Sequence, residues 1–349
     1  MTPVSSKPST LREHDAPAAP GVAPAAPLER LRRGMGRLLA AQEIPALLGL
    51  LMVGVFFSLA TPFFFTELNL FQLTRQTALL AVIAVGMTFV ISAGEIDISV
   101  GSMYNLAANV MALLIAQSGL DPWTASLYAL GVGVLAGALN GALTVLLKLP
   151  TLIVTLGTVS LYRGITIMLS GGLSIGNLPA SDFYGLGSEG LGRFPYMAMI
   201  ALGIVIVAAW AFRKTVFARQ LLAIGSNVAA ARRTGVRVNR LKVAVMALNG
   251  LMCGMAAVLG MAYLRSASPQ SGVSYELLAI AAVVVGGTPL RGGVGTVWGT
   301  LIGITLIMVI QNGLILMGLP AAWQVAATGA LIIGAVAIQQ LVRKRARIG

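Results

Sequence analysis

The chain has 349 residues, of which 57% are hydrophobic and only 10% are charged. Soluble domains carry roughly a quarter charged residues, so this composition excludes an ordinary water-soluble fold. A net charge of +13 would suggest nucleic acid in a soluble protein, but in a membrane protein it reports the positive-inside rule. One cysteine and one histidine exclude an internal disulfide and disfavour a transition-metal site. We therefore expect a membrane protein with no nucleic-acid partner and no cofactor.

Residues 1–43 are rich in proline and alanine and end in arginines beside the first apolar run. They predict a disordered cytoplasmic tail. No short apolar core with a small-residue cleavage site precedes Ile44, so we expect no cleavable signal peptide. At the other end, residues 342–349 predict a basic cytoplasmic C-terminus.

Apolar runs long enough to cross ~30 Å of hydrocarbon follow one another through residues 44–341. They predict one transmembrane domain of an all-α polytopic membrane protein, with about ten transmembrane helices, some broken or short. The runs are 44–62, 76–93, 101–117, 125–147, 151–169, 196–212, 243–264, 277–290, 296–317 and 321–341. The 277–290 run ends in glycines and suggests a broken helix, and the 151–169 run is expected to be tilted or half-length.

An even number of spans places both termini on the same side as the long loop 213–242. That side collects the tail arginines, the many basic residues of the loop and the basic C-terminus, whereas acids outnumber bases on the other side. Because lysine and arginine gather in cytoplasmic loops, we predict that the loop and both termini are cytoplasmic.

An internal repeat is visible between residues 79–85 and 277–283. Each segment is followed by a break that contains glycine and then by another long apolar run. Chance similarity between helices rich in leucine, alanine and valine is the alternative. A true duplication would suit a transporter, since many are built from two related halves.

Motifs for self-contained catalysis are missing from the sequence. None of its lysines follows a glycine, so there is no phosphate-binding G-x-x-x-x-G-K-[ST] loop. No H-E-x-x-H pattern is present either. If this chain drives transport, its energy comes from another chain or from an ion gradient.

The basic loop contains a helix with both end signals. Ser226 or Asn227 can cap a new helix, and Gly235 supplies a stop. The alanine-rich stretch between them predicts a short surface helix with alanines on one side and arginines on the other. Such a helix buries little area alone, so it either docks into a partner or belongs to a solvated loop that only sets topology.

Three ordered motifs resemble those of ABC permeases of the ribose/xylose/arabinose class. Residues 94–102 resemble the signature G-x-I-D-[IL]-S-V-G-S, and the spacing G-x-N-x-x-A-A-x-x-x-G in 225–235 resembles the cytoplasmic coupling segment. Residues 275–295 resemble the C-terminal signature. The resemblance covers about 44–341 and leaves out the tail. Val228 departs from it, since an acidic residue or proline is more usual there.

This resemblance implies a bacterial inner-membrane permease subunit rather than an enzyme. It implies a dimer with a second copy or a related chain, two ATP-binding cassette subunits or one duplicated ATPase chain, a periplasmic sugar-binding protein and surrounding membrane lipid. The cargo would be a monosaccharide or related polyol, and a separate subunit would hydrolyse ATP. The residues that would couple to the ATPase are Gly225, Asn227, Ala230, Ala231, Arg232 and Gly235.

Polar residues within or beside the apolar runs are candidates for the translocation pathway or gate, because a hydroxyl-rich solute needs hydrogen-bond donors and acceptors. The candidates are Glu95, Asp97, Asn105, Asn109, Asn140, Thr155, Asn249 and Asn312. Asn105 and Asn109 are four residues apart and share one helix face. Hydrogen bonds between helices, without contact to solute, are the alternative for each of them.

Carboxylates near a membrane boundary are costly unless hydrated or paired. Glu95 and Asp97 therefore gate the pathway, pair with a basic residue such as Arg291, or relay protons; Asp97 is alternatively a cap for the helix from Ser99 onward. These readings stay open.

Glycine spacing predicts close helix crossings. The glycines concerned are Gly133, Gly137, Gly141, Gly250, Gly254, Gly295, Gly299 and Gly303. The pairs Gly286-Gly287 and Gly292-Gly293 interrupt a span instead, and they predict an unwound or hinged element near the pathway.

Two further functions remain. One is a proton-coupled secondary transporter of a small polar solute, driven through Glu95 or Asp97. The other is a membrane-embedded enzyme acting on a lipid-linked substrate, for which the sequence offers no catalytic constellation. No feature of the sequence selects a particular sugar.

Overall fold

The structure, a computed structural model, describes residues 43–348, without the side chains of residue 321 and of residues 338–348. The predicted tail up to residue 42 and the basic side chains of the predicted C-terminus lie outside the described residues. The part of the chain that is described is almost entirely α-helical, with one two-stranded hairpin. The predicted all-α class is confirmed.

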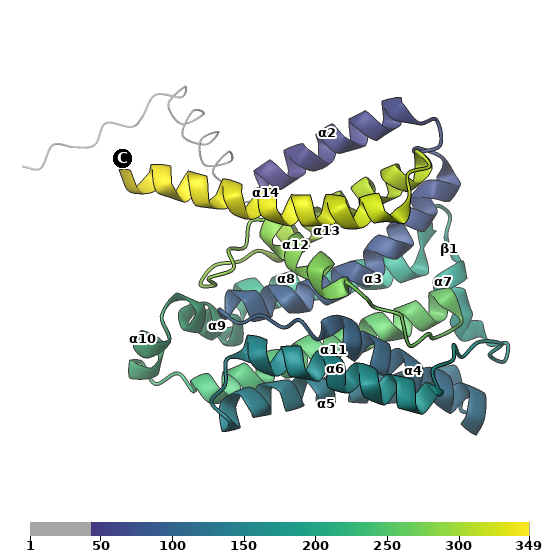
Figure 1. The fold of residues 1–349 in the computed structure, drawn as a ribbon, viewed down its shortest axis with the longest axis horizontal. Coiled ribbons are helices and arrows are strands. Elements are labelled where there is room, and N and C mark those ends of the chain that lie inside the picture. Colours follow the sequence, from purple (N-terminus) through teal and green to yellow (C-terminus); the bar gives the residue numbers. More distant parts are fainter. Residues whose placement is uncertain (1–42, 349) are drawn as a thin grey trace, which may run out of the picture. The chain divides into compact units, whose positions relative to one another are not determined.

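The helices follow one another in the order shown in Figure 1. They are α2 (Ile44–Ala60), α3 (Glu67–Ser92), α4 (Val100–Ser118), α5 (Pro122–Leu146), α6 (Thr151–Ser170), η1 (Asp182–Tyr184), α7 (Gly185–Ser188), α8 (Tyr196–Lys214), α9 (Val216–Ser226), α10 (Val228–Arg233), α11 (Val238–Leu264), α12 (Tyr275–Val285), α13 (Val297–Leu316) and α14 (Ala321–Ile348). The strands β1 (Gly190–Leu191) and β2 (Phe194–Pro195) pair antiparallel.

Seven of the described helices are long and apolar enough to cross a membrane. They are α3, α4, α5, α6, α8, α11 and α13. The remaining predicted spans form the shorter apolar helices α2 and α12 and the stretch Ala322–Ala337 of α14. As predicted, α12 stops at the glycine pair that follows it. The half-length reading of the 151–169 run is wrong, because Pro150 is the N-cap of α6 and a full 20-residue helix follows it.

Three features of the fold differ from the hydropathy reading. The helix α3 begins at Glu67 rather than at 76, and it carries Arg75 inside the fold. Two nitrogens of the Arg75 guanidinium donate hydrogen bonds inside the fold, one to the carbonyl oxygen of Gly187 at 2.6 Å and one to Gln72 Oε1 at 2.7 Å. The segment after α6 folds into short helices and the hairpin, and the basic loop contains the additional helix α9.

The helix α3 is the centre of the fold. Every residue from 78 to 92 is buried, as expected of a helix that is apolar on all sides. It contacts α8, α11, α12 and α13, and in Figure 1 it passes between α4–α6 with α11 on one side and α12–α14 on the other. The helices α2, α5, α6 and α8 expose large apolar side chains, as surfaces that meet lipid do.

The predicted close crossings are confirmed at two helix pairs. A Cβ atom on Gly133 of α5 would overlap the carbonyl oxygen of Gly250 of α11. Likewise, a Cβ on Gly299 of α13 would overlap the carbonyl oxygen of Gly286, which follows α12. Small residues let these backbones touch, and α11 and α13 are thereby fixed against their neighbours.

Candidate functional site

The two breaks of the internal repeat meet in space. One is the connection 93–99 between α3 and α4, and the other is the connection 286–296 between α12 and α13. The N–H group of Gly293 donates to the carbonyl oxygen of Ser92 at 2.9 Å. A Cβ atom on Gly292 would lie 2.5 Å from the backbone nitrogen of Gly94. The segments related by the repeat are therefore in direct backbone contact.

The end of α9 packs into the same contact. A Cβ atom on Gly225 would overlap the carbonyl oxygen of Ser92 and lie 2.5 Å from the nitrogen of Gly293. Gly94, Gly292 and Gly293 have φ angles of +77°, +76° and +83°, in the region that favours glycine. We call Gly94, Gly225, Gly292 and Gly293 with Ser92 the glycine junction. It joins three backbones with no side chain between them.

The predicted short helix follows directly as α10. The Asn227 side chain accepts a hydrogen bond from the Ala230 N–H at 3.0 Å, and Gly235 ends the helix with a φ of +82°. Both end signals are confirmed. Ala231 is only 4% exposed and packs with Ile224 and Val238 inside this chain.

The outward face of α10 is thus smaller than the sequence suggested. Val228, Ala229, Ala230 and Arg232 are exposed, and Ala231 anchors the helix to α9 and α11 instead. A partner that binds α10 would contact small apolar side chains beside the Arg232 guanidinium group.

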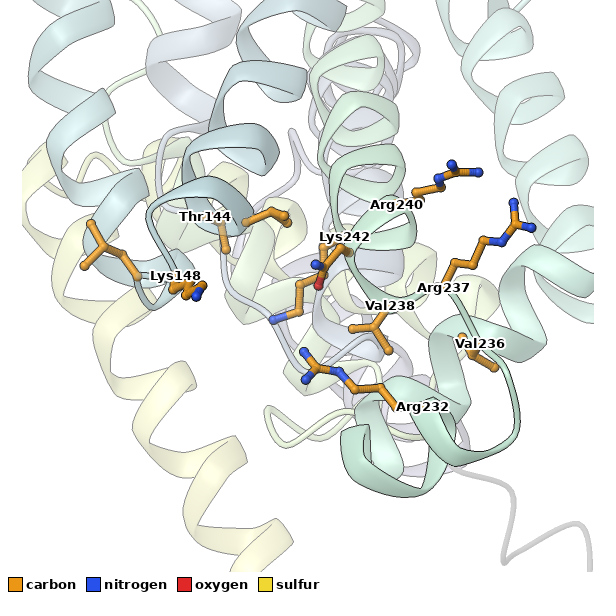
Figure 2. Close-up of a pocket in the computed structure, with 11 residues that line it drawn as sticks. Thr144, Lys148, Arg232, Val236, Arg237, Val238, Arg240 and Lys242 are labelled. Atoms are coloured by element: carbon orange, nitrogen blue, oxygen red, sulfur yellow. The ribbon is translucent and has the colours of Figure 1, made fainter.

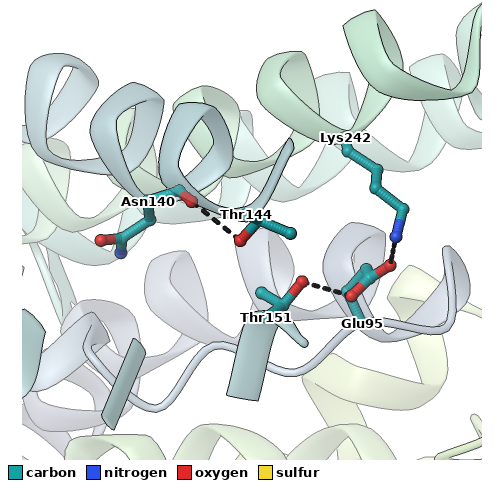
Figure 3. Close-up of polar contacts among 5 residues, drawn as sticks. All are labelled: Glu95, Asn140, Thr144, Thr151 and Lys242. Atoms are coloured by element: carbon teal, nitrogen blue, oxygen red, sulfur yellow. Dashed lines mark hydrogen bonds and ion pairs between the residues drawn. The ribbon is translucent and has the colours of Figure 1, made fainter. Parts of the chain in front are cut away.

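Glu95 lies on the connection 93–99 and is held from two sides (Figure 3). Lys242 of α11 forms an ion pair with it, and the Thr151 hydroxyl of α6 donates a hydrogen bond to it. The side chains of Lys242 and Glu95 are 23% and 14% exposed, so water screens the pair only partly. The expected pairing with Arg291 is wrong, since among the described residues Lys242 forms the ion pair with Glu95 and Arg291 forms none with either carboxylate.

Asp97 is the centre of a buried polar network. Its Oδ1 accepts from the Ser99 N–H at 2.9 Å and from the Ser99 hydroxyl at 2.6 Å, and its Oδ2 accepts from Asn249 Nδ2 at 2.9 Å. Asn140 Nδ2 donates to the Ser99 hydroxyl at 2.8 Å, and the Tyr162 hydroxyl donates to Asn140 Oδ1 at 2.8 Å. These five residues, the Asp97 network, join the connection to α5, α6 and α11.

The network lies deep in the fold. Asn249 is about 16 Å along α11 from Val238, at ~1.5 Å per residue, and this is near the middle of the 27-residue helix. Because Glu95 contacts Lys242 near the start of the same helix, the connection turns inward along α11. The sequence placed both carboxylates near a boundary, and for Asp97 that expectation is wrong. The expected capping contact is present, because Asp97 Oδ1 accepts the Ser99 N–H at 2.9 Å; by the bounds of α4, however, Ser99 is the N-cap residue, and it makes no side-chain capping bond.

A buried carboxylate is stable only with good partners. Asp97 is 0% exposed, and no basic side chain among the described residues pairs with it. Neutral donors satisfy it instead, which fixes the connection 93–99 to α11 at this depth. Thr155 adds a weaker contact, since its hydroxyl oxygen lies 3.4 Å from the Ile98 nitrogen that donates to it.

Asn105 and Asn109 share one buried face of α4, as predicted. Asn105 Nδ2 donates to the Pro269 carbonyl oxygen at 2.6 Å, and Asn109 Nδ2 donates to Asn105 Oδ1 at 2.6 Å. The oxygen Oδ1 of Asn109 is buried and has no partner among the described residues. The two amides hold the loop 265–274 that leads into α12.

Asn312 lies elsewhere. It forms two amide hydrogen bonds, at 2.8 and 3.0 Å, with Asn69 near the start of α3. Asn69 and Ser92 lie at opposite ends of α3, about 35 Å apart at ~1.5 Å per residue. The structure therefore groups Glu95, Asp97, Asn140, Thr155 and Asn249 around the connection 93–99 and leaves Asn312 outside.

The sequence reading missed four members of this region, namely Ser99, Thr151, Tyr162 and Lys242. The sequence does carry a signal for two of them, Thr151 and Tyr162. Polar residues recur at helical spacing along the buried face of α6, at positions 151, 155, 158, 162 and 166. Among the described residues, no group of three His, Cys, Asp or Glu side chains lies together as a metal site would require.

Seven helices of spanning length, two broken segments and a buried polar network between them define a multi-pass membrane transport subunit. The family model described as branched-chain amino acid transport system / permease component matches residues 69–336. The chain therefore belongs to that family.

Individual relatives align along almost their whole length. The ribose import permease protein RbsC of Bacillus subtilis (strain 168) is 39% identical over 302 residues, which is 86% of this chain and 93% of the relative. The protein of the same name from Escherichia coli (strain K12) is 37% identical over 302 residues, 85% and 93% of the two chains. The autoinducer 2 import system permease protein LsrC of Enterobacter sp. (strain 638) is 34% identical over 311 residues, 89% and 90%. The resemblance to ABC importer permeases is confirmed.

Proposed function

We propose that the chain forms the translocation pathway for a monosaccharide or related polyol, which a periplasmic binding protein delivers while a separate subunit hydrolyses ATP. The observation that carries this proposal is the alignment with ribose import permeases over 302 residues. Because other relatives are named for import of autoinducer 2, the proposal names a class of small polar solutes and not one sugar.

The assembly proposed is a pair of permease subunits in the bacterial inner membrane, with two ATP-binding cassettes, or one duplicated ATPase chain, on the cytoplasmic side. The basic residues support this orientation, since they gather in α8–α11 and at the chain ends. Both termini are then cytoplasmic. The second permease subunit is a copy of this chain or a related one.

The coupling step follows from the glycine junction. In our proposal, the exposed face of α10 sits in a groove of the ATPase, and closure of that subunit on ATP moves α9 and α10 together. Gly225 passes this motion to Ser92 and Gly293 without an intervening side chain to absorb it. A rigid element that contacts two bistable segments is a recognised way to turn a small displacement into a switch.

The gate is proposed to be the connection 93–99. Glu95 holds it near the start of α11 through Lys242, and Asp97 holds it near the middle of the same helix through Asn249. Movement of the glycine junction pulls on the connection between these two attachments and changes its position against α6 and α11.

The solute is proposed to pass along the polar face of α4. Asn109 Oδ1 accepts no hydrogen bond among the described residues, so it is available to a solute hydroxyl when the loop 265–274 moves. Only weak contacts are needed, because the binding protein carries most of the selectivity in this scheme. We therefore do not propose that the expected site residues form a tight sugar-binding pocket.

Co-purification and a test of the energy source together check the proposal. Affinity purification of the full chain from its native cells is expected to recover an ATPase with a phosphate-binding loop. Sugar uptake is expected to survive collapse of the proton gradient while ATP is maintained. Uptake that stops with the gradient, and a purified chain without an ATPase, would establish the proton-coupled transporter instead.

A further inference from the structure

A cleft of about 800 Å³ opens beside α10, between the C-terminal end of α5 and the start of α11. Five basic side chains line it: Lys148, Arg232, Arg237, Arg240 and Lys242. Figure 2 shows Arg232 and Lys242 extending toward the same space, with Lys148 across from them, whereas the Arg237 and Arg240 side chains extend in the opposite direction, away from Lys148. Four of these cations lie within residues 232–242, and the fifth, Lys148, comes from the connection between α5 and α6, so the fold adds a cation from a distant segment to those of the basic loop.

Most of these cations have no acidic partner among the described residues. Lys242 is the only one of the five with an acidic partner among the described residues, and that partner is Glu95. The first turn of α11 also starts in the cleft, and the side chain of its N-cap Arg237 makes no capping hydrogen bond. The free N–H groups and the dipole of a helix N-terminus favour an anion. Guanidinium groups add a geometry that suits phosphate oxygens.

Apolar side chains make up most of the rest of the lining, with Thr144 and Asn239 as its polar members. Val145, Leu149, Val236 and Val238 complete the walls. Leu149 of the lining is 42% exposed, and Leu146 and Leu147 beside it, at the end of the membrane-spanning helix α5, are 75% and 58% exposed. A ligand that fills this cleft would combine a multiply charged anionic head with a hydrocarbon part.

We propose that the cleft binds the phosphate headgroup of an anionic phospholipid from the surrounding leaflet. Basic pockets between the ends of transmembrane helices are known to suit such headgroups. The apolar side chains of the lining and the exposed leucines beside it favour a lipid over a free phosphate ion or an acidic protein segment. This inference goes beyond the proposed transport role, since it holds whichever solute the chain carries.

Lipid binding here has a consequence for the gate. The Lys242 ammonium group faces both the cleft and Glu95, so a phosphate in the cleft competes with the Glu95 carboxylate for it. Occupancy by lipid weakens the outer attachment of the connection 93–99. Anionic lipid is therefore expected to change how readily the connection moves.

The test is lipid binding by the full-length purified chain in detergent, measured by native mass spectrometry with cardiolipin, phosphatidylglycerol or phosphatidylcholine. A double variant, Lys148→Gln with Arg240→Gln, removes two cleft cations. Each cation contributes about fivefold to binding an anionic lipid surface, so we expect roughly thirtyfold weaker cardiolipin binding. The matched control is Arg213→Gln with Lys214→Gln at the exposed end of α8, which loses the same charge outside the cleft. It is expected to bind cardiolipin as the unmodified chain does.

Four outcomes would overturn the proposal. Phosphatidylcholine could bind as well as cardiolipin, or both double variants could weaken cardiolipin binding equally, and then the cleft gives no headgroup specificity. Inorganic phosphate could displace cardiolipin at equal concentration, and then a free phosphate is the ligand. The ATPase subunit could displace cardiolipin one for one and lose its own association in the cleft variant, and then an acidic segment of that partner fills the cleft. Matching size-exclusion profiles establish that each variant is folded.

Discussion

Replacing Gly225 by alanine tests the proposed path of coupling with a single added carbon atom. Gly225 is helical and has no positive φ, so alanine fits its backbone conformation. The new Cβ, however, would overlap the Ser92 carbonyl oxygen and lie 2.5 Å from the Gly293 nitrogen. Both neighbours are backbone atoms, so relief requires that α9 move away from the junction.

Overpacking of this kind costs about 1–3 kcal/mol. If the strain falls on only one state of the transport cycle, the ratio of the two states changes by about 5- to 150-fold. We expect the Gly225→Ala variant to bind the ATPase normally, because the outward face of α10 is unchanged, but to move far fewer solute molecules per ATP hydrolysed.

The assay reconstitutes the chain with its ATPase and binding protein in vesicles and measures solute uptake and ATP hydrolysis in the same sample. The matched control is Gly131→Ala on α5, where a Cβ atom meets nothing within 4 Å. It should keep the normal ratio of uptake to hydrolysis. A Gly225→Ala variant with that same ratio and an unchanged melting temperature would refute the junction as the coupling path.

Three other variants separate coupling, gating and packing. Replacing Asn227 by alanine removes the cap of α10 and about 1 kcal/mol of its stability, so recovery of the ATPase in a pull-down should fall about fivefold. Replacing Asp97 by asparagine exchanges a charge-assisted hydrogen bond to Asn249 for a weaker neutral one, and the melting temperature should fall; adding Asn249→Asp restores a carboxylate–amide pair and should recover part of the loss. Replacing Asn312 by alanine should lower stability by about 1–3 kcal/mol through the loss of both hydrogen bonds with Asn69, whose side chain keeps only its bond to the Phe64 carbonyl oxygen, with uptake per folded molecule unchanged.

Each of these expectations has a result that contradicts it. An Asn227→Ala chain that recovers the full amount of ATPase would separate α10 from docking, and Asn239→Ala at the start of α11 is the matched surface control. An Asp97/Asn249 exchange that is no more stable than Asp97→Asn alone would mean that this hydrogen bond does not hold the connection. Slow uptake by a fully folded Asn312→Ala chain would place Asn312 in the pathway after all.

Hydropathy predicted the helices well because lipid requires continuous apolar runs with internally satisfied backbones. It failed at Arg75, where a charge inside α3 was read as the end of a span. That charge is tolerated because Gly187 and Gln72, one of them distant in sequence, accept its hydrogen bonds. A buried ion that finds its partners elsewhere leaves no local pattern.

Cap and stop residues were also predictable, since Asn227 and Gly235 act on their own neighbours. The surface that α10 offers was not predictable in the same way. Ala231 is indistinguishable from Ala230 by composition, and only packing against Ile224 and Val238 makes it internal. The residues that begin and end α10 could be recognised in the sequence. Which of its side chains face the solvent depends on how α10 packs against α9 and α11.

The depth of Asp97 shows the same limit at the candidate gate. Its partner Asn249 lies 152 residues further along the chain. The motif around 94–102 marked the segment as special, but nothing within it indicates that the connection turns inward along α11. The repeat relates the two breaks in the sequence. Their direct contact is visible only in the folded arrangement of α3, α9 and α12.

The most direct measurement of the central claim is uptake by vesicles that contain the full-length chain, its ATPase and its binding protein. Labelled monosaccharides and polyols, ribose among them, are offered outside, with ATP or a proton gradient supplied separately. The account predicts accumulation of at least one of these solutes with ATP and the binding protein both present, and none with a proton gradient alone. Accumulation driven by the gradient without ATP would contradict it.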